Sequence, residues 1–480
     1  MDNQKATSGR IFRIGLVTPL EKLAPHQGIN FAHMSTMWQI YEPAYRSTMH
    51  SEQIEPVLLD YPLQKEANIG GPTTYSAAVR PGHYFSDGTE LRAEHIATSL
   101  QKTPSFAAQA STTAQSGRVF FTLKRPNANF QFALARHDHP IALERGSEFI
   151  GTGPYMLGPN PTPECFRLLR NPYYKESTGP AEVECRIYPL DPDGGHRKLL
   201  YAVQRGEVDF TEELPRKQLD SVENMKKFID LGFCTAILFF NTEKPLFSDP
   251  RVRLAFSHAI NRKTLAGQSY SNALAFAASG LLPPSLGSTP DGIMTDLPRA
   301  RELLAQANVK PTAVPLSLWV VPVPRPHLPQ PRATAQMIAD QLGQLGFTIE
   351  IGQARTVADF YEIGGRGTYD LLLSGWIPDS VDPLEFMEAV LASYNIPSSM
   401  AGGISGANYS RWRSPAIDEA IRNQRAAPNL ETWKTICNMV VKETPFLPLM
   451  YGPRICIVSW RVKKFPRNFT NRPFLAEIEF

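Results

Sequence analysis

The sequence lacks the features of a membrane-spanning protein and of a disulfide-bonded one. No window approaches the ~20 apolar residues that a transmembrane helix needs. Cysteine is scarce, with 5 in 480 residues, and an odd number argues against a complete set of disulfides. No two cysteines have Cys-x-x-Cys spacing, which argues against a metal cluster. We expect all five to be small residues in or near the cores: Cys165, Cys185, Cys234, Cys437 and Cys456.

The common catalytic motifs are also missing. There is no Gly-x-Ser-x-Gly elbow, no phosphate-binding loop ending in Gly-Lys-Ser/Thr, no Gly-x-Gly-x-x-Gly and no His-Glu-x-x-His. His137 and His139 alternate and could pair on a metal from one side of a strand, but we favour solvated loop histidines. The sequence therefore predicts no enzyme, no metal site and no cofactor.

A strong charge of either sign is absent. The 49 basic and 46 acidic residues are interspersed and leave a net charge of +3, which gives no field suited to nucleic acid or an anionic membrane. The first ten residues are polar and lead into a strand-like segment at 11–17, so no secretory signal is visible. Either an export signal was removed, or the protein stays in the cytoplasm.

The sequence does contain alternating short β-type runs and amphipathic helices, over a length that suggests two or three domains. In residues 332–351, apolar side chains recur at helical spacing, Gly346 ends the helix and an alternating strand follows. Asp249 and Pro250 are predicted to begin another helix as its cap and first-turn residue. These patterns predict an α/β architecture.

A series of short motifs follows in one order from about residue 11 to residue 460. Gly151-Thr-Gly-Pro-Tyr155 lacks the lysine and the following helix of a phosphate-binding loop, so we expect a tight turn between strands. The same pentapeptide resembles a motif of the peptide- and nickel-binding class of bacterial solute-binding proteins, family 5, which serve ABC importers. Other segments similar to that family are Val79–Glu94, Leu169–Tyr174, Val203–Asp209, Phe239–Arg253, Ala259–Arg262, Tyr369–Trp376, Asn408–Trp412 and Pro445–Leu449.

The resemblance implies a fold as well as a function. The family's fold is α/β, a two-lobed periplasmic-binding-protein-like fold of type II (cluster C) with an extra inserted subdomain and a two-strand hinge. Carried over to this chain, lobe I takes residues 1–46, 150–243 and 452–480. The inserted subdomain takes residues 47–149, and lobe II takes residues 244–451.

The resemblance also implies a binding site for a small peptide-like ligand. Asp379 follows Trp376 at the position where, in peptide-binding members, an aspartate pairs with the α-amino group of the ligand. Arg325 in Arg325-Pro326 is similar to the arginine that grips the ligand's carboxylate in dipeptide-binding members, and guanidinium geometry suits a carboxylate. Trp376 is expected to pack over ligand side chains. Asp382, beside Pro383, is expected to hold a turn.

Each of these assignments has an alternative that the sequence leaves open. Asp379 could be a solvated loop acid, Arg325 a surface arginine and Trp376 a core residue of its lobe. The implied partner is an ABC permease of the peptide-import type, with the protein acting as a monomer in the periplasm or at the cell surface. The alternative keeps the fold but makes the chain a cytoplasmic ligand-sensing module without a transport role.

Overall fold

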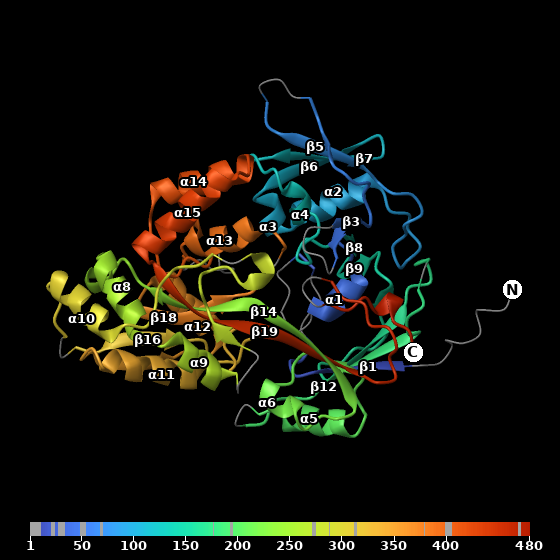
Figure 1. The fold of residues 1–480 in the computed structure, drawn as a ribbon. Coiled ribbons are helices and arrows are strands. Elements are labelled where there is room, and N and C mark those ends of the chain that lie inside the picture. The colour runs from blue at the N-terminus through green and yellow to red at the C-terminus, as the bar shows by residue number, and fades with distance from the viewer. Residues whose placement is uncertain are drawn as a thin grey trace. The chain divides into compact units, whose positions relative to one another are not determined.

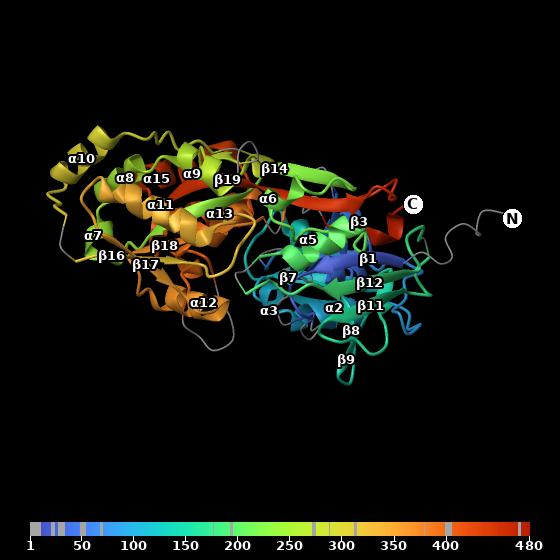
Figure 2. The ribbon, with the colours of Figure 1, turned by 90° about the horizontal axis from the view of Figure 1, so that it is seen from below.

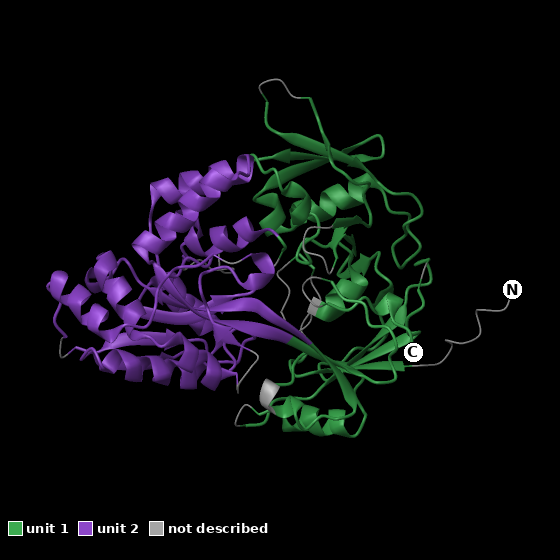
Figure 3. Ribbon diagram, viewed as in Figure 1, with its two compact units in different colours: residues 1–228, 379–381, 455–480 green, residues 229–378, 382–454 purple. Residues whose placement is uncertain are grey.

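The computed structural model describes residues 11–20, 25–26, 34–48, 54–67, 71–175, 177–192, 195–270, 275–287, 289–311, 314–378, 380–398, 406–468 and 472–480. The chain divides into two compact units, which Figure 3 colours separately. Unit 1 comprises residues 1–228, 379–381 and 455–480, and unit 2 comprises residues 229–378 and 382–454. Two strands, β14 (Met225–Phe240) and β19 (Phe446–Ser459), contribute residues to both units.

Unit 1 is built on a mixed sheet with the strand order β10, β11, β12, β1, β13, β19. β1 runs parallel to β12, with Ile11 opposite Glu182, and parallel to β13. The antiparallel pairs are β10 with β11, β11 with β12, and β13 with β19. The strand bounds are Tyr155–Leu157 (β10), Cys165–Arg170 (β11), Glu182–Ile187 (β12), Ile11–Leu16 (β1) and Phe210–Thr211 (β13).

Both faces of this sheet are covered. Successive side chains of a strand point to opposite faces, and in β19 Cys456 and Val458 join one hydrophobic core while Ile457 joins another. Helix α1 (Met34–Ile40) packs into the first core. Helix α5 (Arg197–Gln204) packs into the second, with the short α6 (Arg216–Leu219) nearby in Figure 1.

A second, smaller sheet in unit 1 has its own hydrophobic core. Its strand order is β4 (Gln64–Lys65), β5 (Thr74–Ala78), β7 (Arg118–Leu123) and β6 (Ala110–Gln115), all antiparallel. Helix α2 (Ala93–Lys102) packs beside this sheet, as Figure 1 shows, with α3 (Pro104–Ala107) and α4 (Phe130–Ala133) next to it. Two hairpins complete unit 1: β2 (Tyr45–Ser47) with β3 (Ile54–Pro56), and β8 (Ala142–Arg145) with β9 (Glu148–Gly151).

Unit 2 is built on a sheet with the strand order β19, β14, β18, β16, β17. β18 (Leu371–Trp376) pairs antiparallel with β14 and parallel with β16 (Leu316–Val320), which in turn is parallel to β17 (Ile349–Gln353). The short β15 (Phe276–Ala277) pairs with β19. Parallel neighbours bring the carboxyl ends of β16 and β18 to the same edge of the sheet, which matters for the site below.

Most helices of unit 2 begin at a polar side chain that satisfies a free backbone amide, as helix starts require. The capped helices, with the cap in each case, are α8 (Pro250–Ala259, Asp249), α9 (Arg262–Ser269, Asn261), α10 (Leu297–Gln306, Asp296), α12 (Val357–Arg366, Thr356), α13 (Pro383–Leu391, Asp382), α14 (Pro415–Ala426, Ser414) and α15 (Leu430–Glu443, Asn429). Helices α7 (Pro245–Ser248) and α11 (Pro331–Gly343) begin with proline and have no side-chain cap.

α8 lies beside α10 in both Figure 1 and Figure 2, and α14 packs against α13 and α15. In the described part of the chain, 3-10 turns lie at Pro284–Leu286 and Ser393–Asn395 in unit 2 and at Leu475–Glu477 in unit 1.

Several predictions from the sequence are confirmed. The helix, glycine and strand predicted over residues 332–351 are α11, Gly346 with φ +90° and β17. Asp249 caps α8 by accepting a hydrogen bond from the amide of Arg251, with Pro250 in the first turn. Cys185, Cys234 and Cys456 are buried, while Cys165 and Cys437 are only partly so. Among the described residues, no helix combines the length and the hydrophobicity needed to cross a bilayer.

His139 corrects one expectation. The sequence favoured solvated loop histidines, but His139 is fully buried, with Nδ1 2.6 Å from the carbonyl of Ala133 and Nε2 3.1 Å from the hydroxyl of Ser105. Asp138 pairs with Arg136 at 2.8 Å. The described residues contain no group of three or more His, Cys, Asp and Glu side chains able to hold a metal. His139 therefore serves the packing of the small sheet's core.

Candidate functional site

The candidate site lies at the edge of the unit 2 sheet where β16 and β18 end. β16 ends at Val320 and β18 at Trp376, and the two strands are parallel neighbours. The loop after β16 carries Arg325, and the loop after β18 leads to Asp379. In open α/β sheets, ligands bind beyond the carboxyl ends of the strands. The topology therefore brings the two predicted loops to one edge of the sheet.

Trp376 is the last residue of β18 and is half-buried. It pairs with Thr235 of the antiparallel neighbour β14. Core positions of β18 are different, since Leu371, Leu372 and Leu373 are fully buried. Trp376 thus keeps part of its surface exposed at the end of its strand.

Arg325 is held in a tight turn. Its amide donates to the carbonyl of Leu328 at 3.0 Å, and the amide of Leu328 donates back to the carbonyl of Arg325 at 2.9 Å. Leu328 is fully buried, and the hydroxyl of Tyr270 donates to the carbonyl of Pro326. Arg325 is partly buried, and it forms no ion pair with another residue in the described part of the chain. Its charge is therefore available to another anion.

His327, in the same turn, was not predicted from the sequence. Its ring packs against the backbone of β18: a Cβ added to Gly375 would lie 2.6 Å from its Cδ2. Burial, and then the charge of Arg325, lower the pKa of His327 to about 3. The only signal in the sequence was its place two residues after Arg325. A buried histidine cannot be told from an exposed one by residue type.

Asp379, the predicted partner of the ligand's amino group, lies outside the described residues. Asp382 is 4% exposed and accepts a hydrogen bond from the amide of Leu384 at 2.9 Å, which caps α13. Arg425 lies 3.6 Å from the same carboxylate. Asp382 was expected to hold a turn, and the structure shows it as the cap of α13.

Three polar residues of the family-like motifs form hydrogen bonds to backbone groups distant in sequence. Asn241 Nδ2 donates to the carbonyls of Gly367 and Tyr369, at 3.0 and 2.7 Å. Asn171 Nδ2 donates to the carbonyl of Gly153 at 2.9 Å. Asp209 accepts from the backbone amide of Arg13 at 2.9 Å. Such bonds satisfy buried backbone groups where strands give way to loops.

The Gly151–Tyr155 segment is the tight turn that the sequence predicted, because it connects β9 to β10. A Cβ at Gly151 would lie 1.8 Å from the carbonyl oxygen of Ile40, and one at Gly153 would lie 2.4 Å from that of Gln39. Only glycine lets the turn approach the end of α1 so closely. The motif therefore serves packing.

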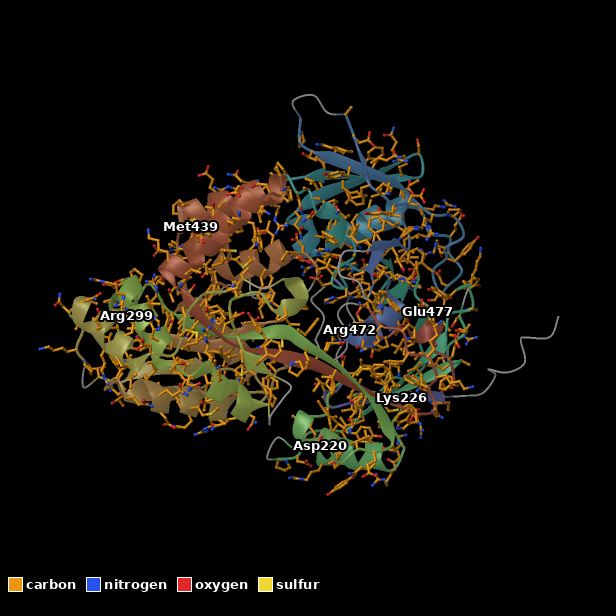
Figure 4. All side chains as sticks on the ribbon, viewed as in Figure 1. Asp220, Lys226, Arg299, Met439, Arg472 and Glu477 are labelled. Carbon is orange, nitrogen blue, oxygen red and sulfur yellow. The ribbon has the colours of Figure 1, made fainter. Side chains whose placement is uncertain are left out.

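A separate shallow hollow lies within unit 1. Its lining includes Glu42, Arg46 and Tyr174. The guanidinium of Arg46 stacks 4.6 Å from the ring centroid of Phe474 and donates to Glu477 at 2.8 Å. Figure 4 labels Glu477, together with Arg472 of the same C-terminal segment. Because its cation is already paired, we assign this hollow no ligand.

Burial raises the pKa of Glu42 to about 7, against the smaller opposing effects of the Thr152 and Tyr174 hydroxyls and of the Arg46 charge. Glu42 is 8% exposed. Its carboxyl group therefore changes protonation near neutral pH, which gives unit 1 a pH-dependent stability.

Comparison with solved structures shows which known fold this chain has. The fold matches the dipeptide-binding protein from Pseudoalteromonas sp. SM9913 in complex with Met-Leu with a TM-score of 0.82 and 19% identity, covering 98% of this chain and 100% of that chain. At this identity the likeness establishes the fold alone. The predicted fold class, a two-lobed α/β solute-binding protein, is confirmed.

Comparison of sequences then gives the family. The family described as bacterial extracellular solute-binding proteins, family 5, middle region, matches residues 67–398. The chain belongs to this family. It is 26% identical over 348 residues to the peptide transport periplasmic protein SapA of Haemophilus influenzae, covering 70% of this chain and 58% of the relative. It is 24% identical over 366 residues to heme-binding protein A of the same species, covering 75% and 64%. The chain thus spans less than two thirds of these relatives' own length.

Proposed function

We propose that this protein captures a small peptide-like ligand and delivers it to an ABC permease of the peptide-import type. The observation that carries the proposal is the partly buried Arg325 at the carboxyl edge of the unit 2 sheet, which has no ion pair with another described residue. A charged group that will be removed from water needs an opposite charge. The carboxylate of a short peptide supplies one.

The second charge of a zwitterionic peptide is assigned to Asp379. Its carboxylate would pair with the ligand's α-amino group, while Trp376 packs over a ligand side chain. Support comes from the topology, which brings the loops after β16 and β18 to one edge. An acid and an arginine in one site would favour a dipeptide or an amino-acid derivative over an uncharged solute.

Binding of this kind works by closure of two lobes around the ligand. We propose lobe I at residues 1–46, 150–243 and 452–480, the inserted subdomain at residues 47–149 and lobe II at residues 244–451. The strands that would form the hinge are β14 and β19, since each contributes residues to both compact units. The ligand stabilises the closed conformer by its greater affinity for that conformer.

Transport is proposed from the family and from relatives such as SapA, which is named a periplasmic peptide transport protein. The protein would act as a monomer in the periplasm or at the cell surface, without nucleic acid and without catalysis. A cytoplasmic ligand-sensing module of the same fold is the second candidate. A cell-fractionation experiment on the native protein distinguishes the two.

The ligand assignment is tested by a cycle of protein variants and ligand variants. Calorimetric titrations use Met-Leu, its N-acetyl derivative and its C-terminal amide, against wild type, Asp379→Asn and Arg325→Met. We expect Arg325→Met to weaken Met-Leu binding by ~30-fold or more, since truncating one partner of a buried charge pair costs ~2 kcal/mol or more. The amide should bind wild type and Arg325→Met equally, because its carboxylate is already gone. The N-acetyl peptide should likewise bind wild type and Asp379→Asn equally.

Matched surface changes serve as controls. Asp340→Asn and Arg355→Met alter exposed helix and loop positions in the same unit, where the Arg355 side chain is 92% exposed. Both should leave the affinity for Met-Leu unchanged. If Arg325→Met lowered the affinity for the peptide and for its amide by the same factor, Arg325 would not pair with the carboxylate.

A further inference from the structure

Trp460 is a large apolar side chain that the fold holds at the surface of unit 1. It follows the end of β19 and is 61% exposed. Its indole Nε1 donates a hydrogen bond to the carbonyl of Glu223 at 3.3 Å, and Nζ of Lys226, which Figure 4 labels, lies 5.4 Å from the ring centroid. These contacts position the indole while more than half of its surface stays open to solvent.

Cationic side chains gather near this tryptophan, from β14 and from the segment that follows β19. Nζ of Lys226 donates to the carbonyl of Val462 at 2.5 Å, which joins the strand to that segment. The guanidinium of Arg467 lies 4.2 Å from the ring centroid of Phe228, which makes a second link between the two. We call the whole set the Trp460 cluster, and its members are Trp460, Lys226, Arg461, Lys463, Lys464 and Arg467.

The acids paired with this cluster balance only part of its charge. Asp209 is 2% exposed, and its single carboxylate is shared by Arg13 and Arg461. Glu479 pairs with Lys464 at 3.2 Å, but both side chains are more than half exposed, and solvent weakens such pairs.

Two lysines of the cluster have no acidic partner. Lys463 is exposed and Lys226 partly so, and neither forms an ion pair in the described ranges of the chain. Glu223, an exposed acid beside Trp460, offsets only one of these charges. The whole chain has 49 basic and 46 acidic residues, and this even balance conceals the cluster, because its cations come from segments that are distant in sequence.

The chemistry of the cluster selects one kind of partner. The core of a protein–protein interface is depleted of charged residues. Lysine and arginine are instead attracted to the anionic headgroups of a membrane, and tryptophan is enriched at the level of the headgroups, because its ring has an apolar body and a polar edge. An exposed indole among cations therefore fits an anionic lipid surface better than it fits another protein.

We propose that the Trp460 cluster docks unit 1 on the surface of an anionic membrane, with the indole at the level of the headgroups and the cations against the lipid phosphates. The cluster shares no residue with the proposed ligand site, so the inference goes beyond the proposed function and does not depend on the identity of the ligand. Attachment of this kind keeps the protein close to the bilayer that contains its proposed permease.

Vesicle flotation with the full chain tests the inference. The protein should float with vesicles of phosphatidylcholine and phosphatidylglycerol in equal amounts, and not with vesicles of phosphatidylcholine alone. Raising NaCl from ~0.1 to ~1 M should release it, because the Debye length falls from about 10 to about 3 Å. Lys463→Gln should weaken binding to the anionic vesicles by ~5-fold, since one cation near the surface is lost. Trp460→Ala should weaken it by ~5-fold or more, since the buried apolar area is lost.

Matched changes elsewhere on the surface are the controls. Lys310→Gln removes an exposed lysine of unit 2, and Tyr201→Ala removes an aromatic ring that is 53% exposed on α5. Both variants should float as wild type does. The inference is wrong if wild type floats with neither kind of vesicle, if it floats equally with both, or if Lys463→Gln and Trp460→Ala bind the anionic vesicles as tightly as wild type. Titration with Met-Leu measures the proposed function separately, because neither substitution alters a residue assigned to the ligand.

Discussion

At the scale of single residues, Glu42 shows how burial alone makes a side chain respond to pH. Its pKa in the folded protein is raised to about 7, above the unfolded value of 4.5. The folded state therefore binds more protons than the unfolded state between these two values. By linkage, the contribution of Glu42 to stability is fully present below pH 4.5 and is lost as the pH rises through 7.

Glu42→Gln should remove this pH dependence. As the pH rises from acidic to mildly alkaline, the unfolding free energy of wild type should fall by roughly 3 kcal/mol relative to that of the variant. Each pKa unit corresponds to about 1.4 kcal/mol. Urea denaturation of both proteins at a series of pH values measures it. Glu148→Gln, an exposed change on β9, is the control. Parallel pH curves for Glu42→Gln and wild type would show that Glu42 does not bind a proton on folding.

At the scale of elements, Arg253 joins three helices of unit 2. It projects from α8, is 2% exposed and donates to the carbonyls of Phe247 and Ser248 at 2.8 and 3.0 Å. Its Nε also donates to the carbonyl of Glu443, the last residue of α15, at 3.0 Å. A cation at the carboxyl end of a helix is favourable, because free carbonyls and the helix dipole make that end negative.

Arg253→Met should therefore destabilise unit 2. We expect a loss of ~3–5 kcal/mol, because the substitution leaves several buried carbonyls without a donor. The exposed neighbour Arg251, paired with Asp249 at 2.6 Å, offers a matched control, and Arg251→Met should cost less than ~1 kcal/mol. Denaturant midpoints followed by circular dichroism compare the two. Equal midpoints for the two variants would contradict the anchoring role.

Elements whose signals are local were predictable from the sequence. Asp249 with Pro250 predicts the start of α8, and Gly346 predicts the end of α11. Both signals are local, because a helix cap and a positive φ each depend on the type of one residue. The exposure of Trp376 and the burial of His327 were not predictable in this way. Both depend on which strand lies beside β18 and on how the loop after β16 packs on it, and that packing is set by residues distant in sequence.

At the scale of the whole molecule, the family-like motifs predicted the fold better than they predicted the site. Asn241, Asn171 and Asp209 form hydrogen bonds to backbone groups near strand ends. The segments that contain them therefore indicate the fold, irrespective of the ligand. The ligand depends instead on a few side chains in two loops. Asp379, one of those side chains, lies outside the described residues and stays a prediction, as do the proposed lobe boundaries.

The most direct test of the central claim is a calorimetric titration of the wild-type protein with Met-Leu. The account predicts saturable binding of one peptide per chain, with a negative heat-capacity change because apolar surface is buried when the lobes close. Binding should weaken when either charged end of the peptide is blocked. Heats no larger than those of dilution, for Met-Leu and for a panel of other di- and tripeptides, would contradict the peptide-binding function.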